Sequence, residues 1–297
     1  MAGKQLRYAF FPGCTLESAV AELKVATELT CKKLGIELVE IDGWTCCGAS
    51  QIQDIDANVG LLINARNIAL AEKQGFDRIL TVCNTCTLML RNAKRQLDES
   101  PELKAKVNEG LAKIGLEYRG TAEITHYLWV LVKDYGLEKL ASKVSRPLRD
   151  MKVANFYGCH ILLPPKIMGF EDERNPRSME MLAEACGAQS IDFEQRLGCC
   201  GFHSIYPAEE EAEKSCGTIE LVARKQGADC IVTPCPLCHM ALDMWQADSQ
   251  KYYKEDITMP IIHVPQLVGL ALGFSPQEMS INHHIVSAMP MLKKKLA

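Results

Sequence analysis

Cys46-Cys47-Gly48 is a triplet that few proteins carry even once, and this chain carries it again as Cys199-Cys200-Gly201. The first pair stands between Cys14 and the segment Cys83-Asn-Thr-Cys86, with spacers of 31 and 35 residues. Around the second pair the same order returns, with spacers of 39 and 34 residues, in Cys159 and Cys235-Pro-Leu-Cys238. Ten of the fourteen cysteines thus form two matching sets of five, which predicts two copies of one domain.

The composition limits the class of protein. The 297 residues are 47% hydrophobic and 24% charged, which is typical of globular domains and sufficient for two cores. A net charge of −4 without a basic block argues against nucleic acid as a partner. The first residues lack the apolar region of a signal peptide, and the longest apolar run, 261–274, is too short and polar to cross a bilayer. We therefore expect a cytoplasmic protein with no membrane span, whose reduced cysteines serve metal or redox chemistry.

The repeat extends beyond the cysteines. The segment 8–14 resembles 153–159, and 72–81 resembles 223–233. The spacer between Cys159 and Cys199 is about eight residues longer than its counterpart in the first copy, which indicates an insertion there. We predict an N-terminal domain over 1–147 and a C-terminal domain over 148–297.

Strand-like and helix-like patterns alternate along the first copy, in the order 6–11, 18–34, 36–41, 57–74 and 78–82. In the second copy Asn175-Pro176 predicts the cap and first turn of a helix with a buried stripe of Met179, Leu182, Ala183 and Cys186. The alternation predicts an α/β fold, with two tandem pseudo-symmetric domains that each hold a small parallel Rossmann-like sheet flanked by helices. Because parallel strands end at one edge of the sheet, we expect five thiols of each domain to converge there.

Several kinds of chemistry use cysteine. Buried free cysteine behaves as a small hydrophobe, an interpretation that suits the four cysteines outside the two sets, Cys31, Cys186, Cys216 and Cys230. Zinc binds C-x-x-C pairs, but a zinc site uses four ligands and each set contains five cysteines. Zinc in either domain is therefore disfavoured. A thioredoxin-like dithiol needs a single C-x-x-C. Iron–sulfur ligation is favoured, and a fifth cysteine indicates a cluster larger or more distorted than a cubane.

The repeated pattern, together with Gly158-Cys-His160 and Pro234-Cys-Pro-Leu-Cys-His239, resembles the B subunit of heterodisulfide reductase and the wider CCG-domain proteins, including heterodisulfide reductase-like subunits of bacterial sulfur metabolism. The resemblance covers the whole chain, and only the 34-residue spacer lies at the short edge of the pattern. It implies two non-cubane 4Fe–4S clusters. The implied ligands are Cys14, Cys46, Cys47, Cys83 and Cys86 for the first cluster, and Cys159, Cys199, Cys200, Cys235 and Cys238 for the second.

The resemblance also implies a function. The chain would be the catalytic subunit of a heterodisulfide reductase or reductase-like complex, and thus an oxidoreductase. It would cleave or form a disulfide between the two clusters. The substrate could instead be sulfur bound to a protein or to lipoate. Its implied partners are the ferredoxin-like C subunit and the flavoprotein A subunit of such a complex. The alternative is an electron-transfer subunit between a dehydrogenase and quinone, although such subunits usually carry an additional ferredoxin module. No G-x-G-x-x-G follows a predicted strand, so we expect neither a nicotinamide nor a flavin on this chain.

Histidines distinguish the second copy from the first. Three hydroxyl residues, Thr15, Ser50 and Thr87, are matched by His160, His203 and His239. Because histidine titrates near neutral pH, we predict that His160 and His203 are catalytic proton carriers. Alternatively, these histidines donate hydrogen bonds to cluster sulfurs and tune the reduction potential of the cluster. For His239 we prefer this second role. His126 and His263 each open an apolar helix and are expected to be structural groups whose hydrogen bonds are satisfied within the fold. For the basic residues of the insertion we expect a solvated surface and not a substrate-binding role. These residues are Lys166, Arg174, Arg177 and Arg196.

Overall fold

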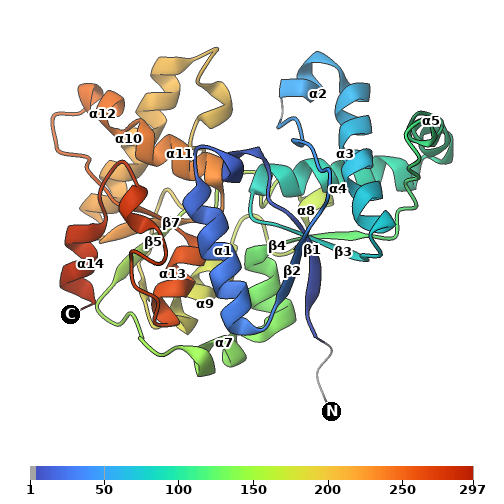
Figure 1. The fold of residues 1–297 in the computed structure, drawn as a ribbon. Coiled ribbons are helices and arrows are strands. Elements are labelled where there is room, and N and C mark those ends of the chain that lie inside the picture. Colours follow the sequence, from blue (N-terminus) through green and yellow to red (C-terminus); the bar gives the residue numbers. More distant parts are fainter. Residues whose placement is uncertain (1–4, 50, 297) are drawn as a thin grey trace.

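The computed structural model describes residues 5–49 and 51–296, and contains two parallel four-stranded sheets of the same topology (Figure 1). The first has the order β2-β1-β3-β4, with β1 (Arg7–Phe11), β2 (Glu37–Glu40), β3 (Arg78–Thr81) and β4 (Glu123–His126). The second has the order β6-β5-β7-β8, with β5 (Lys152–Asn155), β6 (Gln189–Ser190), β7 (Cys230–Thr233) and β8 (Ile261–His263). The predicted α/β fold with two parallel sheets is confirmed. The division at 147/148 stays a prediction.

Helices connect the strands and cover the sheets. In the first half they are α1 (Ala21–Leu34), α2 (Gln51–Ile55), α3 (Ala57–Lys73), α4 (Asn84–Glu99), α5 (Pro101–Ala112), α6 (Tyr127–Trp129), a π-helical segment (Val130–Gly136) and α7 (Leu137–Lys143). In the second half they are α8 (Pro165–Met168), α9 (Ser178–Ala185), α10 (Glu209–Lys225), α11 (Pro236–Met244), α12 (Gln246–Ser249), α13 (Val264–Ala271) and α14 (Met289–Lys295). Short 3₁₀ turns lie at 14–17, 202–204, 250–252 and 281–283.

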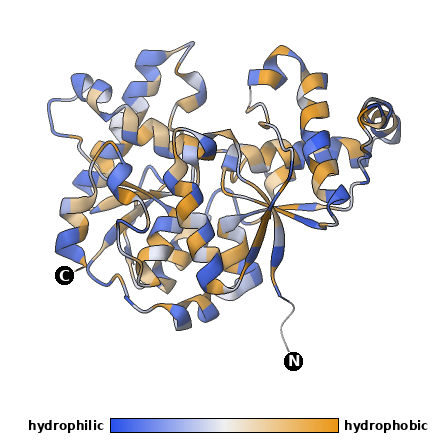
Figure 2. Cartoon of the chain, in the orientation of Figure 1, coloured by the Kyte–Doolittle hydropathy of each residue, from blue (hydrophilic) through white to orange (hydrophobic). Residues whose placement is uncertain are grey.

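The hydrophobic core runs through both halves of the chain. The central strands β1 and β7 are apolar and buried on both faces, as expected when helices cover both sides of a parallel sheet. One apolar cluster joins Leu23 of α1 to Leu267 of α13, and the other joins Phe11 to Phe156. Figure 1 shows α1 lying against α13, and Figure 2 shows hydrophobic colouring on the strands and inner helix faces. The two halves therefore bury apolar surface against each other.

Two predicted helix starts need correction. The first helix begins at Ala21 and not at Ser18, because Cys14–Glu17 form a 3₁₀ turn that positions Cys14. Helix α9 begins at Ser178, two residues beyond the predicted Asn175-Pro176 cap and first turn. There the carboxylate of Glu171 accepts hydrogen bonds from the backbone N–H groups of Arg177 and Ser178, at 2.7 and 2.9 Å. The predicted stripe on α9 is buried as expected.

Within residues 5–49 and 51–296, no helix has both the length and the apolar character that a bilayer crossing requires.

Candidate metal centre

The ten repeated cysteines lie in the segments that follow the carboxyl ends of strands, and two of them, Cys86 and Cys238, lie in the first turns of α4 and α11. Cys14, Cys46 and Cys83 follow β1, β2 and β3, and Cys159, Cys199 and Cys235 follow β5, β6 and β7, each by two to nine residues. Because the strands of each sheet are parallel, the loops meet at one edge. The four remaining cysteines are at most 1% exposed and lie in the apolar clusters, as the sequence predicted.

The two Cys-Cys-Gly turns have the same local geometry. The backbone N–H of Gly48 donates to the Sγ of Cys46 at 3.4 Å, and Gly201 donates to Cys199 at the same distance. Both glycines have a positive φ, +83° and +76°, which is the conformation that glycine adopts without strain. The sequence repeat is therefore also a repeat of geometry, in which the glycine turns its N–H back toward the first sulfur.

Within the first set the thiols contact one another in pairs. The Sγ atoms of Cys46 and Cys14 are 3.4 Å apart, and those of Cys47 and Cys86 are also 3.4 Å apart. Cys83 hydrogen-bonds to Cys86 and completes this set. These distances exceed the roughly 2.05 Å of a disulfide bond, and all ten thiols are free.

The second set has the matching contacts. Cys159 hydrogen-bonds to Cys199, Cys200 to Cys238, and Cys238 to Cys235. A close backbone approach supports this arrangement, because a Cβ placed on Gly158 would lie only 2.7 Å from the Sγ of Cys238. Gly13 plays the same part in the first set, where a Cβ would lie 3.0 Å from the Sγ of Cys86. Each set is thus packed against a glycine of its first loop.

The two sets meet at the junction of the halves. The thiols of Cys83 and Cys235 lie next to each other and interact across this junction, and both side chains are buried. Next to them the side-chain amide of Asn84 donates to the backbone carbonyl of Tyr157 at 2.8 Å. The two sets therefore form one continuous group of thiols across the interface, which the spacing of the cysteines did not reveal.

Each set contains a thiol that is poised to ionise. The hydrogen bond from Cys14 lowers the pKa of Cys46 far below its ordinary value, and further thiol and backbone N–H contacts add to this effect. The hydrogen bond from Cys159 likewise lowers the pKa of Cys199 to about 6. Since the thiolate is the form that binds metal, both sets are electrostatically suited to ligation.

A small cavity of about 20 Å³ lies among the cysteines of the second set and is lined from both halves of the chain; it is called the pocket below. Its lining residues are Asn84, Thr85, Cys159, His160, Cys199, Cys200, Phe202, His203, Cys235, Leu237 and Cys238. Asn84 and Thr85 belong to the Cys83-Asn-Thr-Cys86 segment of the first set, so this segment forms one wall of the pocket. Sequence reasoning missed both residues, although their place between two predicted ligands was a signal for them.

His160 and His203, the two predicted proton carriers, are brought together at this pocket. Their ring centroids are 5.0 Å apart. The hydroxyl of Thr85 lies 2.9 Å from Nδ1 of His160 and 3.5 Å from Nε2 of His203. Burial lowers the pKa of both histidines, and the neighbouring His203 lowers that of His160 further. Ser50, the counterpart of His203 in the first copy, lies outside the described residues.

His239 does not join this pair. Its ring stacks on His263 at a centroid distance of 3.8 Å, and its ring nitrogens have no close hydrogen bond among the described residues. The expected contact of His239 with a cluster sulfur stays a prediction. His126 satisfies the structural expectation in part, because its Nδ1 accepts from the backbone N–H of Leu128 at 3.1 Å. His263 likewise opens α13 in a capping box with Gln266, whose side-chain oxygen accepts the backbone N–H of His263 at 3.0 Å, and its Nε2 lies 3.7 Å from the carboxylate of Glu22.

The basic residues of the insertion are not part of the pocket lining. Arg196 instead holds the insertion together, with an ion pair to Glu180 at 3.3 Å and a hydrogen bond to the side chain of Asn175 at 2.9 Å. It is therefore a structural group and not a freely solvated one.

The residues of each set fit an iron–sulfur cluster. Five thiols from three loops converge, one of them has a lowered pKa, and a glycine leaves room for the sulfurs. Five sulfur donors exceed the four that a tetrahedral zinc site uses.

Comparison with known proteins agrees with this geometry. The family model of the CCG cysteine-rich domain matches residues 8–91 and 153–243, so this chain belongs to the CCG cysteine-rich domain family. It is 50% identical to the 8-methylmenaquinol:fumarate reductase membrane anchor subunit of Wolinella succinogenes, over 96% of this chain and 98% of that one. It is 37% identical to the B subunit of the ferredoxin:CoB-CoM heterodisulfide reductase of Methanosarcina mazei, over 97% and 96% of the two chains.

A solved structure shares the fold. It is a hypothetical protein from Helicobacter pylori, with a TM-score of 0.78 and 21% identity, and it matches 96% of this chain and about half (53%) of its own length. The sequence relatives bear out the predicted resemblance to the B subunit of heterodisulfide reductase. One relative has a name that refers to a quinol and a membrane. Electron transfer with a quinone was the second of the two functions predicted from the sequence.

Proposed function

We propose that the ten cysteines hold two non-cubane 4Fe–4S clusters, and that the chain passes electrons between a substrate that binds beside the second set and a partner subunit of a redox complex. The observation that supports this most is the continuous group of thiols across the junction, with His160, His203 and Thr85 at one end. A path of metal centres and a nearby pair of proton carriers are what a two-electron, two-proton substrate requires when electrons move singly.

We put a quinol first among the substrates. The relative named for quinol:fumarate reductase shares half of its residues with this chain over almost its full length. This ranking reverses the order predicted from sequence alone. Oxidation of a quinol releases two electrons and two protons, so the protons need acceptors beside the pocket. The partner would then be the subunit that carries a dehydrogenase or reductase site.

Disulfide reduction is the second candidate function. It is supported by the heterodisulfide reductase relatives and by a pocket that is walled by all five cysteines of the second set. It needs the same one-electron path and the same proton carriers, with the direction of proton transfer reversed. The ferredoxin-like C subunit and the flavoprotein A subunit stay the predicted partners for this case, and the cytoplasmic location stays a prediction.

The chain's own residues have separate duties in either reaction. When bound, iron–sulfur clusters supply one-electron redox steps. The Thr85 hydroxyl contacts Nδ1 of His160 and so fixes the orientation of that ring. Since burial keeps His160 and His203 neutral near pH 7, each can accept a proton from a substrate hydroxyl or thiol. Phe202 and Leu237 contribute apolar wall and limit the access of water.

The test compares the two substrates on the same preparation. The full-length chain would be purified anaerobically with its partner subunits, and turnover would be measured with a water-soluble quinol and with a mixed disulfide of two low-molecular-weight thiols. Quinol-dependent turnover that exceeds disulfide-dependent turnover supports the first assignment, and the reverse order supports the second. A protein without iron would overturn both.

Replacement of His160 by Ala is expected to lower kcat about a hundredfold, because general acid–base groups contribute factors of about 10² to 10⁴. Iron content should be unchanged, and added imidazole should restore part of the rate. The matched control is His283→Ala, which removes an exposed histidine of the second half. Full turnover in His160→Ala and in His203→Ala, with iron intact, would exclude the proton-carrier role.

A further inference from the structure

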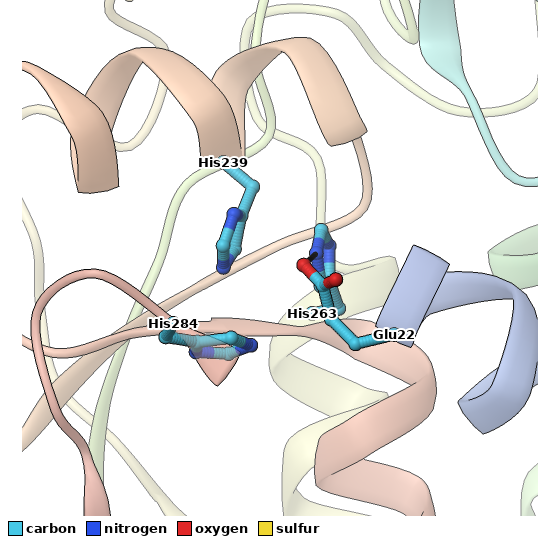
Figure 3. A group of neighbouring side chains, drawn as sticks. All are labelled: Glu22, His239, His263 and His284. Carbon is cyan, nitrogen blue, oxygen red and sulfur yellow. Dashed lines mark ion pairs between the residues drawn. The ribbon is translucent and has the colours of Figure 1, made fainter. Parts of the chain in front are cut away.

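Outside the cysteine site, four buried side chains of metal-binding type point toward one another (Figure 3). They are Glu22, His239, His263 and His284, which are 8%, 2%, 0% and 7% exposed. One ligand atom from each lies within 4.8 Å of those of the other three. Glu22 comes from α1 in the first half of the chain, and the three histidines come from the second half. The cluster therefore lies between two halves of the protein.

These side chains have few partners of their own. Within the described part of the chain, both ring nitrogens of His239 and of His263 lack a hydrogen bond, as does Nδ1 of His284. Glu22 approaches Nε2 of His263 only at ion-pair distance, 3.7 Å. Buried polar atoms are nearly always hydrogen-bonded in folded proteins, so several imidazole nitrogens without a close hydrogen bond, gathered in one place with a carboxylate, indicate a missing ligand.

The first copy of the domain has no such cluster among its described residues. His126, the counterpart of His263, uses its Nδ1 to accept a backbone N–H. Thr87, the counterpart of His239, donates its hydroxyl hydrogen bond to the backbone carbonyl of Cys83 at 2.9 Å. Nε2 of His126 stays without a hydrogen bond, but among the described residues no group of ligand-type side chains gathers around it. The gathering of several such side chains is therefore particular to the second copy and is not a requirement of the fold.

The surroundings hold the cluster in place. The side-chain oxygen of Gln266 accepts the backbone N–H of His263 at 3.0 Å, and its nitrogen lies 3.0 Å from Nε2 of His284. Asp243, one turn beyond His239 on α11, accepts the backbone N–H groups of Ile285 and Val286 and so anchors the loop that carries His284. Outer contacts of this kind orient the ligands in metal sites.

We propose that Glu22, His239, His263 and His284 bind a divalent transition-metal ion, and that this ion is zinc. Three imidazoles and one carboxylate are a ligand set that tetrahedral zinc accepts.

The proposed ion has a structural role. Ligand atoms of a tetrahedral zinc site lie about 3.4 Å apart, given bonds of about 2.0–2.1 Å, so ligand atoms that are as much as 4.8 Å apart must approach by up to about 1.4 Å around it. Four protein ligands leave no open position for a substrate, which is typical of structural sites. The ion ties α1 of the first half to α11 and α13 of the second. His284 is the ligand with a competing contact, to Gln266, and contributes least to affinity.

The experiment measures the zinc content of the full-length chain and the atoms that coordinate the zinc. The chain is purified anaerobically, dialysed against a small excess of Zn²⁺ and then dialysed against buffer. We expect about one zinc per chain, with an X-ray absorption spectrum at the zinc edge that shows a nitrogen and oxygen shell at about 2.0–2.1 Å. A sulfur shell at about 2.3 Å would place the zinc on the cysteines and would overturn the proposal, as would the absence of zinc.

Variants locate the ion. Glu22→Gln and His263→Gln should each lose the zinc while iron content is retained, and His284→Gln should keep a larger share of it. The matched controls are Glu28→Gln, on the exposed side of the same helix, and His283→Gln, exposed beside His284. If Glu22→Gln fails to fold, His263→Gln carries the test, because it too is expected to lose the zinc. Retention of full zinc in all three ligand variants would overturn the proposal. Because zinc and iron are counted separately, this outcome is independent of the proposed electron transfer.

Discussion

The Cys86→Ser variant is expected to lose one of the two clusters, so that iron falls from about eight to about four atoms per chain. Cys86 is 5% exposed, its Sγ is 3.4 Å from that of Cys47, and it lies over Gly13. A serine oxygen is a poor substitute for a thiolate sulfur in a cluster and leaves the first set with four thiols. Since both clusters lie on the proposed electron path, turnover should be lost and not merely slowed.

The measurement is iron and acid-labile sulfide content, followed by turnover with the substrate that the wild-type complex uses. The matched control is Cys31→Ala, which removes a buried thiol in α1 that belongs to neither set. That control should keep its iron and lose only about 1 kcal/mol of stability, because a small buried side chain is shortened. If Cys86→Ser retained eight irons, the assignment of the first five-cysteine set would be wrong.

The Gly201→Ala variant is expected to destabilise the second half by about 3 kcal/mol and to reduce its iron content. Gly201 has a φ of +76°, where a residue with a Cβ is strained by about 1–2 kcal/mol. The added methyl would also lie 2.8 Å from the Cα of Ala212, in the backbone of α10. Helix α10 cannot move away without shifting Cys216 and the core around it, so the loop that carries Cys199 and Cys200 must move instead.

A second glycine separates these two effects. Gly227 follows α10 with a φ of +81°, and a Cβ placed there meets nothing within 4 Å. Gly227→Ala should therefore cost only the backbone strain, about 1–2 kcal/mol, and leave the iron content unchanged. The midpoints of anaerobic chemical unfolding of the two variants give the comparison. Equal losses of stability at Gly201 and Gly227 would contradict the proposed clash with α10.

Much of the fold was predictable because its signals are local and repeated. The strands at 7–11, 37–40 and 78–81 lie within the predicted runs, and the cysteines follow them as expected. Where prediction failed, a distant residue had intervened. Helix α9 starts at Ser178 because Glu171, seven residues earlier, caps it, and no rule of spacing identifies that carboxylate.

The sequence predicted which cysteines form each set, but it did not predict that the two sets meet. The contact of Cys83 with Cys235 depends on how two sheets pack, and the spacing within each copy carries no information about that. The same holds for Glu22 and His263, which lie 241 positions apart and meet only because α1 packs on α13. His263 had the appearance of a helix cap, like His126, since both precede an apolar helix. What distinguishes the two is that His263 faces Glu22, His239 and His284.

The packing of α1 on α13 has a consequence for the order of events during synthesis. Leu23 and Ala26 of α1 share one apolar cluster with Leu267 and Val268 of α13. The ribosome makes α1 first and must add about 230 residues before α13 begins, which takes roughly 10–50 s at typical rates of elongation. During that time the apolar side of α1 has no final partner. We expect nascent chains that end before α13 to be sensitive to protease within α1 and to recruit chaperones, and chains that include it to become resistant.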